Sequence, residues 1–166
     1  MFYDGEPISN EAFIANWRDI QPYLAMVDAE LEKEGELPLT FFEAFTVLAF
    51  ACFADAPVDV AVIEVGMGGE WDSTNVADGQ VAVFAPISLD HVARLGSTVA
   101  EIARTKAGII KPDAIVVTAE QSGDALSELS SAAERNNASM SVQQRQFSLV
   151  SSAVAVGGQL DRRQRE

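Results

Sequence analysis

The chain has 166 residues, and hydrophobic residues make up 48% of it, so it is long and apolar enough for one domain with a hydrophobic core. Charged residues make up 22%, which excludes a wholly disordered chain. The formal net charge of −14 argues against nucleic acids and acidic membranes as partners, because both bind basic surfaces.

The sequence indicates a cytoplasmic protein. Its single cysteine, Cys52, excludes an internal disulfide and suits a reducing compartment. No apolar run reaches the roughly 18 residues of a membrane span. The first residues have neither the basic nor the apolar region of a secretory signal.

Two helices are predicted in the N-terminal part. Ser9 can cap the first, whose apolar face has helical spacing and which ends at Gly35. Pro22 should kink or restart this helix. Thr40 and Glu43 form a possible capping box for a second helix, which ends at about residue 54 and is followed by Pro57.

The rest of the chain alternates strands with helices. Residues 58–65 are β-branched and nearly all apolar, which predicts a buried strand of a parallel sheet that is covered on both faces. Further strands are expected at 81–87 and 114–118, and 147–156 resembles a strand or hairpin. This alternation predicts an α/β fold with a mostly parallel sheet flanked by helices.

The helices between these strands have clear local signals. Thr98 and Glu101 form a second possible capping box, opening a short helix that ends near Gly108. A longer helix is expected at 124–136. Gly157 and Gly158 form a predicted turn, and residues 161–166 are a polar tail without pattern.

Three chemically active side chains fall beyond predicted strands or at a helix end. Glu64 ends the strand at 58–65 and precedes a glycine-rich stretch, Gly66 to Gly69, where the backbone can approach a ligand closely. His91 is the single histidine and follows the strand at 81–87, whereas Lys106 ends the short helix. Taken singly, each also has a structural explanation: a carboxylate binding loop amides, a capped loop histidine, and a lysine that complements a helix dipole.

Together these residues suggest a metal site, because ligands bind beyond the carboxyl ends of parallel strands. A carboxylate and an imidazole can share a divalent cation, and Mg²⁺ accepts few protein ligands beside water and phosphate oxygens. A nucleophilic lysine can take up CO₂ and become a carbamate, which is an anionic oxygen ligand. The expected metal ligands are therefore Glu64, His91 and carbamylated Lys106.

The sequence contains no recognisable nucleotide-binding loop. The glycine cluster is not a dinucleotide fingerprint, because Trp71 stands where a glycine is needed. A Walker A loop is absent, since no Gly-Lys pair occurs in the chain. No cofactor-binding residues are therefore assigned.

Several motifs in order resemble folylpolyglutamate synthase/dihydrofolate synthase, a branch of the Mur ligase superfamily. The residues that resemble this family lie at 5–9, 39–43, 58–76, 89–91 and 102–112. The resemblance implies that 1–166 is a single partial domain, the middle of the family's central ATPase domain. The segment with the phosphate-binding loop and the C-terminal domain would both be absent, so the domain would be truncated at both ends.

The resemblance also implies a reaction and its small-molecule substrates. ATP, a co-substrate, phosphorylates a carboxylate of dihydropteroate or of a folate glutamate tail. The amine of L-glutamate then attacks the acyl phosphate and forms an amide. Mg²⁺ assists as the cofactor. The isolated chain is expected to be inactive.

On the matching positions, the resemblance implies roles for individual residues. Glu64 and His91 would hold Mg²⁺, and Lys106 would be the catalytic, carbamylated lysine at a second metal position. The residues at the pterin-binding surface would be Thr40, Trp71, Asp72 and Ser73. Glu70 departs from the family, which usually has a basic residue there.

Two other interpretations remain open. A non-catalytic remnant or binding module is the first, favoured by Glu70 and by the tail without pattern. A Mur-type ligase acting on a peptidoglycan precursor is the second, although the patterns at 39–43 and 68–75 favour the folate branch.

Overall fold

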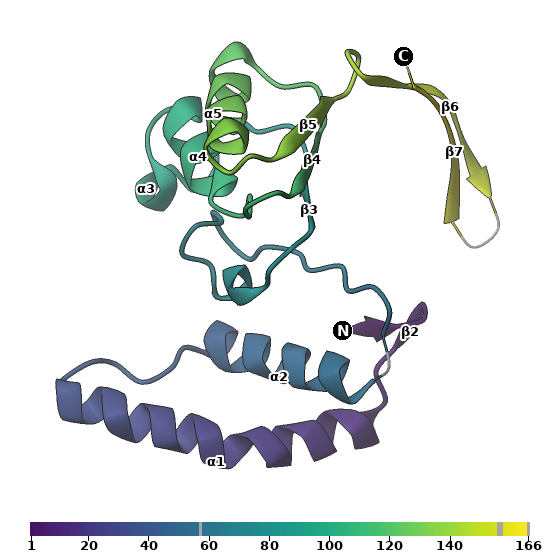
Figure 1. Cartoon of the computed structure of the whole chain (residues 1–166). Coiled ribbons are helices and arrows are strands. Elements are labelled where there is room, and N and C mark those ends of the chain that lie inside the picture. Colours follow the sequence, from purple (N-terminus) through teal and green to yellow (C-terminus); the bar gives the residue numbers. More distant parts are fainter. Residues whose placement is uncertain (57, 156–157, 166) are drawn as a thin grey trace. The chain divides into compact units, whose positions relative to one another are not determined.

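The computed structural model describes residues 1–56, 58–155 and 158–165 of the chain. It divides the chain into two compact units, Met1–Glu64 and Val65–Glu166, called here the first and the second unit (Figure 1). Among the described residues, no helix is both long and apolar enough to cross a membrane.

The first unit begins with a short antiparallel hairpin of β1 (Phe2–Tyr3) and β2 (Glu6–Pro7). The hairpin leads into α1 (Asn10–Glu34), which begins as predicted, with the Ser9 side chain accepting a hydrogen bond from Ala12 N. Helix α1 ends as predicted at Gly35, whose φ of 77° is left-handed. Pro22 neither ends nor restarts the helix: α1 is continuous from Asn10 to Glu34, and Pro22 lies inside it.

The second helix of this unit is α2 (Phe41–Asp55). The predicted capping box is confirmed: Glu43 N donates to Thr40 Oγ1 at 3.2 Å, and Thr40 N donates to the Glu43 carboxylate at 2.7 Å. Hydrogen bonds from the Thr40 hydroxyl and backbone lower the pKa of Glu43, although its small burial opposes this. Pro57, predicted to follow this helix, lies outside the described residues.

A small hydrophobic cluster joins the two helices of the first unit. Ile20 on α1 and Leu48 and Cys52 on α2 are buried at its centre. Partly buried side chains complete it, among them Phe13, Trp17 and Phe45. Burial raises the pKa of the Cys52 thiol, with Asp55 contributing, so the reactive thiolate form is disfavoured.

The strand predicted at 58–65 is absent, and this prediction is wrong. These residues form no strand, and the side chains of Val60 and Val62 are 79% and 89% exposed. Their composition fits a central strand, but a strand exists only where a neighbour completes its hydrogen-bond ladder. In the described part of the chain, no strand pairs with this segment.

The second unit contains the predicted parallel sheet. Its strands are β3 (Val81–Phe84), β4 (Ile115–Thr118) and β5 (Ser139–Val142), in that order, with Val81 opposite Ile115 and Ile115 opposite Ser139. Strand β5 was not expected, because its residues, Ser-Met-Ser-Val, lack a continuous apolar run. The α/β fold with a parallel sheet is confirmed.

Three helices of the second unit lie on one face of this sheet (Figure 1): α3 (Val92–Leu95), α4 (Val99–Ala107) and α5 (Gly123–Arg135). The predicted capping box of α4 is present, with Glu101 N donating to Thr98 Oγ1 at 3.2 Å. Val116, Ile102 and Leu129 are fully buried between sheet and helices. The opposite face of the sheet is exposed at Val81, Val83 and Ile115.

The chain ends in an antiparallel pair, β6 (Phe147–Ala155) and β7 (Gly158–Arg165). The strand or hairpin expected at 147–156 is therefore present as β6, and residues 161–165 of the polar tail, in which the sequence shows no pattern, belong to β7. Strand β7 has little apolar alternation, so only its pairing with β6 reveals it. Gly157 of the predicted turn lies outside the described residues, and Gly158 begins β7.

Candidate active site

The candidate residues are divided between the two units. Thr40 and Glu64 belong to the first unit and are exposed, and the Thr40 hydroxyl is already engaged in the capping box of α2. The others belong to the second unit, where the structure places them on a loop and at helix ends: Trp71, Asp72, Ser73, His91 and Lys106.

The loop of residues 66–76 carries three of the candidates and is built around Asp72. The Asp72 carboxylate accepts hydrogen bonds from Met67 N at 2.7 Å and Thr74 N at 3.0 Å, and it caps the 3₁₀ helix η1 (Ser73–Val76). Burial acts to raise the pKa of this carboxyl, but the hydrogen bonds from Thr74, Met67 and Gly66 outweigh it and lower the pKa. Asp72 is therefore ionised and shapes the loop.

This loop docks on the C-terminal end of α4. Glu70 N donates to Thr105 O at 2.9 Å, and the same carbonyl also accepts from Gly108 N at 3.3 Å. A Cβ at Gly69 would lie 2.8 Å from both Thr105 O and Lys106 O, so only glycine fits there. The sequence predicts that the backbone of these glycines can approach a ligand closely. At Gly69, the backbone instead approaches the C-terminal end of α4.

Lys106 lies in the last turn of α4, next to this docked loop, and is half-buried. Among the described residues, its amine forms no hydrogen bond or ion pair that would occupy it. The structure therefore brings Lys106 and the backbone of the 66–76 loop together, and in the described part of the chain it does not bring Lys106 together with Glu64 or His91. Trp71 on this loop is 78% exposed.

His91 follows the carboxyl end of β3 and precedes α3. Its backbone is left-handed, with φ 47° and ψ 38°, a conformation that costs free energy for a residue other than glycine and is enriched at functional sites. Its Nε2 lies 3.5 Å from the Asp90 carboxylate, and both side chains are exposed. The imidazole is thus accessible at the sheet edge where ligands bind in parallel folds.

The candidate residues supply few metal ligands, so they fit Mg²⁺ only at a site where most ligands do not come from the protein. In the part of the chain that the structure describes, no three His, Cys, Asp or Glu side chains cluster closely enough to hold a metal. A carboxylate, an imidazole and a carbamate would leave the remaining positions to water and phosphate oxygens, which is the usual arrangement for Mg²⁺.

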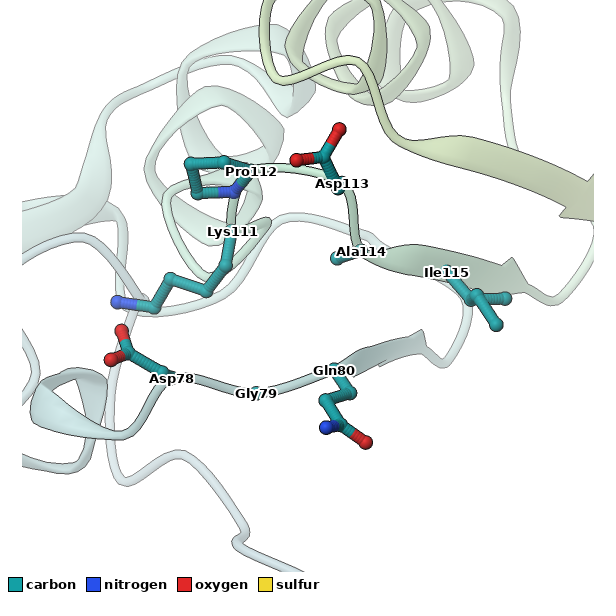
Figure 2. Close-up of a pocket in the computed structure, with 8 residues that line it drawn as sticks. All are labelled: Asp78, Gly79, Gln80, Lys111, Pro112, Asp113, Ala114 and Ile115. Atoms are coloured by element: carbon teal, nitrogen blue, oxygen red, sulfur yellow. The ribbon is translucent and has the colours of Figure 1, made fainter.

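A pocket of about 490 Å³ lies in the second unit. Figure 2 shows it between the segments that precede β3 and β4, with the side chains of Asp78 and Lys111 pointing toward one another. These segments are at the amino ends of the strands, and none of the candidate residues lines the pocket.

Two residues with clear structural roles at this site were not singled out from the sequence. Asn75 Nδ2 donates to both Glu70 O and Gly108 O at 3.1 Å, and Lys111 Nζ donates to Asn75 O at 2.7 Å. The signal was present for Asn75, because it closes the Asp-Ser-Thr-Asn run that contains two of the candidate residues.

Comparisons with known proteins agree with the motif resemblance. No family model matches the chain. It is 43% identical, over 95% of its length, to the dihydrofolate synthase/folylpolyglutamate synthase of Mycobacterium tuberculosis, of which it spans 34%. A crystal structure of the Mycobacterium tuberculosis folylpolyglutamate synthase with ADP and AMPPCP superposes with a TM-score of 0.86 and 44% identity, over 97% of this chain and 37% of that one.

A solved complex of FPGS with AMPPCP and folate is also similar, with a TM-score of 0.84 and 34% identity over 97% of this chain and 38% of that one. The chain thus spans little more than a third of the relatives it matches. Over nearly its whole length, it is homologous to the folylpolyglutamate and dihydrofolate synthases.

Proposed function

We propose that this chain forms part of an ATP- and Mg²⁺-dependent ligase that adds L-glutamate to dihydropteroate or to folate. The observation that carries the proposal is the 43% identity to a dihydrofolate synthase/folylpolyglutamate synthase over 95% of the chain. The docking of the 66–76 loop beside Lys106 supports it, because it joins two of the motifs on which the resemblance rests.

In this reaction, the substrate carboxylate attacks the γ-phosphorus of ATP and ADP leaves. The resulting acyl phosphate is attacked by the amine of L-glutamate, an amide bond forms, and inorganic phosphate leaves with the loss of an amine proton. Such phosphoryl and acyl transfers depend mainly on positioning and on neutralising negative charge. FPGS structures with AMPPCP, and with AMPPCP and folate, support both substrate classes.

Glu64 and His91 would hold Mg²⁺, which would neutralise charge on the phosphate oxygens when bound. The free Lys106 amine would add to CO₂, forming an N–C bond and losing a proton, and its carbamate would supply an anionic oxygen. Thr40, Trp71 and Ser73 would line the pterin surface, with the exposed Trp71 ring available for stacking. Asp72 would act there by shaping the loop.

Metal titration tests the proposed site. We expect Mg²⁺ or Mn²⁺ to bind the 166-residue chain, as measured by calorimetry, and Glu64→Gln and His91→Ala each to weaken binding about tenfold or more. Glu120→Gln is the matched control, because Glu120 is an exposed carboxylate that follows β4. Equal metal affinity in the wild type and both site variants would refute the metal site.

The second candidate function is a non-catalytic binding module. Glu70 favours it, because an acidic side chain on the docked loop would repel the phosphates and carboxylates of the proposed substrates. The sequence also lacks a Gly-Lys pair, so we expect no turnover by this chain alone. Product that depends on both ATP and L-glutamate, detected with the purified chain, would contradict that expectation and exclude the binding module.

A further inference from the structure

Asn75 lies at the centre of the contact between the 66–76 loop and the end of α4. Its side-chain Nδ2 donates to Glu70 O, within the loop, and to Gly108 O, at the cap of α4, both at 3.1 Å. Its own carbonyl accepts from Lys111 Nζ at 2.7 Å, and Lys111 lies beyond the helix end. One residue thus ties together three segments of the second unit.

The chemistry of this position requires an amide. Two carbonyl oxygens face the side chain, so the NH₂ group must point at them, because the reverse orientation would place Oδ1 against both carbonyl oxygens. The Asn75 Oδ1 atom is then buried without a hydrogen-bond partner, the one such side-chain atom among the described residues.

Close backbone contacts make the same junction tight. A Cβ at Gly108 would lie 2.5 Å from the Glu70 Cβ and 2.6 Å from its Cα, so the helix cap and the loop touch through glycine. Lys106 lies two residues before this cap. Thr105 and Gly108, which flank Lys106, are both acceptors of these contacts.

We infer that Asn75 is a positioning residue for Lys106: its amide holds the 66–76 loop on the end of α4 and so keeps the helix end that carries Lys106 next to the loop that carries Trp71. The importance of this position for glutamate ligation rests on the proposed function. The contact itself does not, because no substrate or metal takes part in it.

Asn75→Asp tests the inference, because it keeps the size of the side chain and places a carboxylate against two carbonyl oxygens. We expect the amide proton of Glu70, measured by NMR, to exchange about tenfold faster or more. We also expect acetylation of Lys106, measured by mass spectrometry relative to Lys33 of the first unit, to accelerate several-fold. The chain has three lysines, so Lys33 serves as an internal reference.

Val76→Asp is the matched control, because it adds the same charge one residue away on a side chain that is 76% exposed. We expect both readouts to stay at wild-type values in this variant. If Asn75→Asp does not fold, Asn75→Ala replaces it, since it removes both donors without adding charge.

Unchanged exchange at Glu70 would overturn the inference. Faster exchange with an unchanged Lys106-to-Lys33 ratio would also overturn it, because Asn75 would then stabilise the loop without positioning the lysine. Neither measurement uses metal, ATP or folate, so a failed metal titration would remove the proposed function and leave this result standing.

Discussion

Asp72 shows how a single residue of the motif combines structure with charge. Its two carboxylate oxygens accept hydrogen bonds from Met67 N, Thr74 N and the Thr74 hydroxyl, and these bonds outweigh burial and lower its pKa. Because the folded state prefers the ionised form, Asp72 contributes stability that is present above the pKa of the unfolded carboxyl, about 3.9, and is lost as the pH falls through the lower folded value.

We therefore predict that Asp72→Asn lowers the free energy of unfolding at pH 7 by about 1 kcal/mol, discounted because the group is partly exposed. The difference between the variant and the wild type should shrink as the pH falls below about 4. Urea unfolding at several pH values measures this, with Glu120→Gln as the control. A difference that is constant from pH 7 to pH 3 would contradict the assignment.

At the scale of elements, the 66–76 loop contacts the C-terminal end of helix α4. At the C-terminal end of helix α4, the 66–76 loop donates from Glu70 N to Thr105 O and from Asn75 Nδ2 to Gly108 O. Glycine at position 69 permits this approach, since a Cβ there would lie 2.8 Å from two carbonyl oxygens. The loop and the helix thus behave as one element.

We predict that Gly69→Ala lowers the free energy of unfolding by about 1–3 kcal/mol, because neither rigid carbonyl can move away from the added methyl group. Gly79→Ala is the control, since its Cβ would meet Val81 O at an ordinary 3.7 Å, and we expect a change within about 0.5 kcal/mol. Denaturant unfolding compares the two. Equal free energies of unfolding for the two variants would mean that the loop does not pack closely against the end of α4 at Gly69.

At the scale of the whole molecule, the two units have separate hydrophobic clusters. The cluster of the first unit centres on Ile20, Leu48 and Cys52, whereas that of the second lies between the parallel sheet and its helices. No residue belongs to both clusters among the described residues. A small cluster stabilises its unit weakly, because little apolar surface is buried there.

We predict that Leu48→Ala, which typically costs about 2–5 kcal/mol at a fully buried site, accelerates labelling of the Cys52 thiol much more than Ile102→Ala does. Both side chains are almost completely buried, at 1% and 0% exposure, so the two variants are matched. The rate of reaction with a thiol reagent is the measurement. Equal acceleration by both variants would show that the units open together.

The sequence alone determined the features that depend on neighbours within a few residues. Both capping boxes, the glycine end of α1 and the strands β3 and β4 were predictable, because caps and short apolar runs act locally. The candidate site residues were likewise named from the sequence motifs. Their roles in binding and catalysis stay predictions that the metal titration tests.

Only the tertiary structure decided which segments pair and which loops dock. Residues 58–65 have the composition of a buried strand yet gain no ladder, whereas the polar residues 161–165 gain one from β6. The docking of the 66–76 loop beside Lys106, and the part Asn75 takes in it, join residues more than thirty positions apart. Hydrogen bonds between distant segments depend on where the chain brings each donor and acceptor, and no local pattern encodes that.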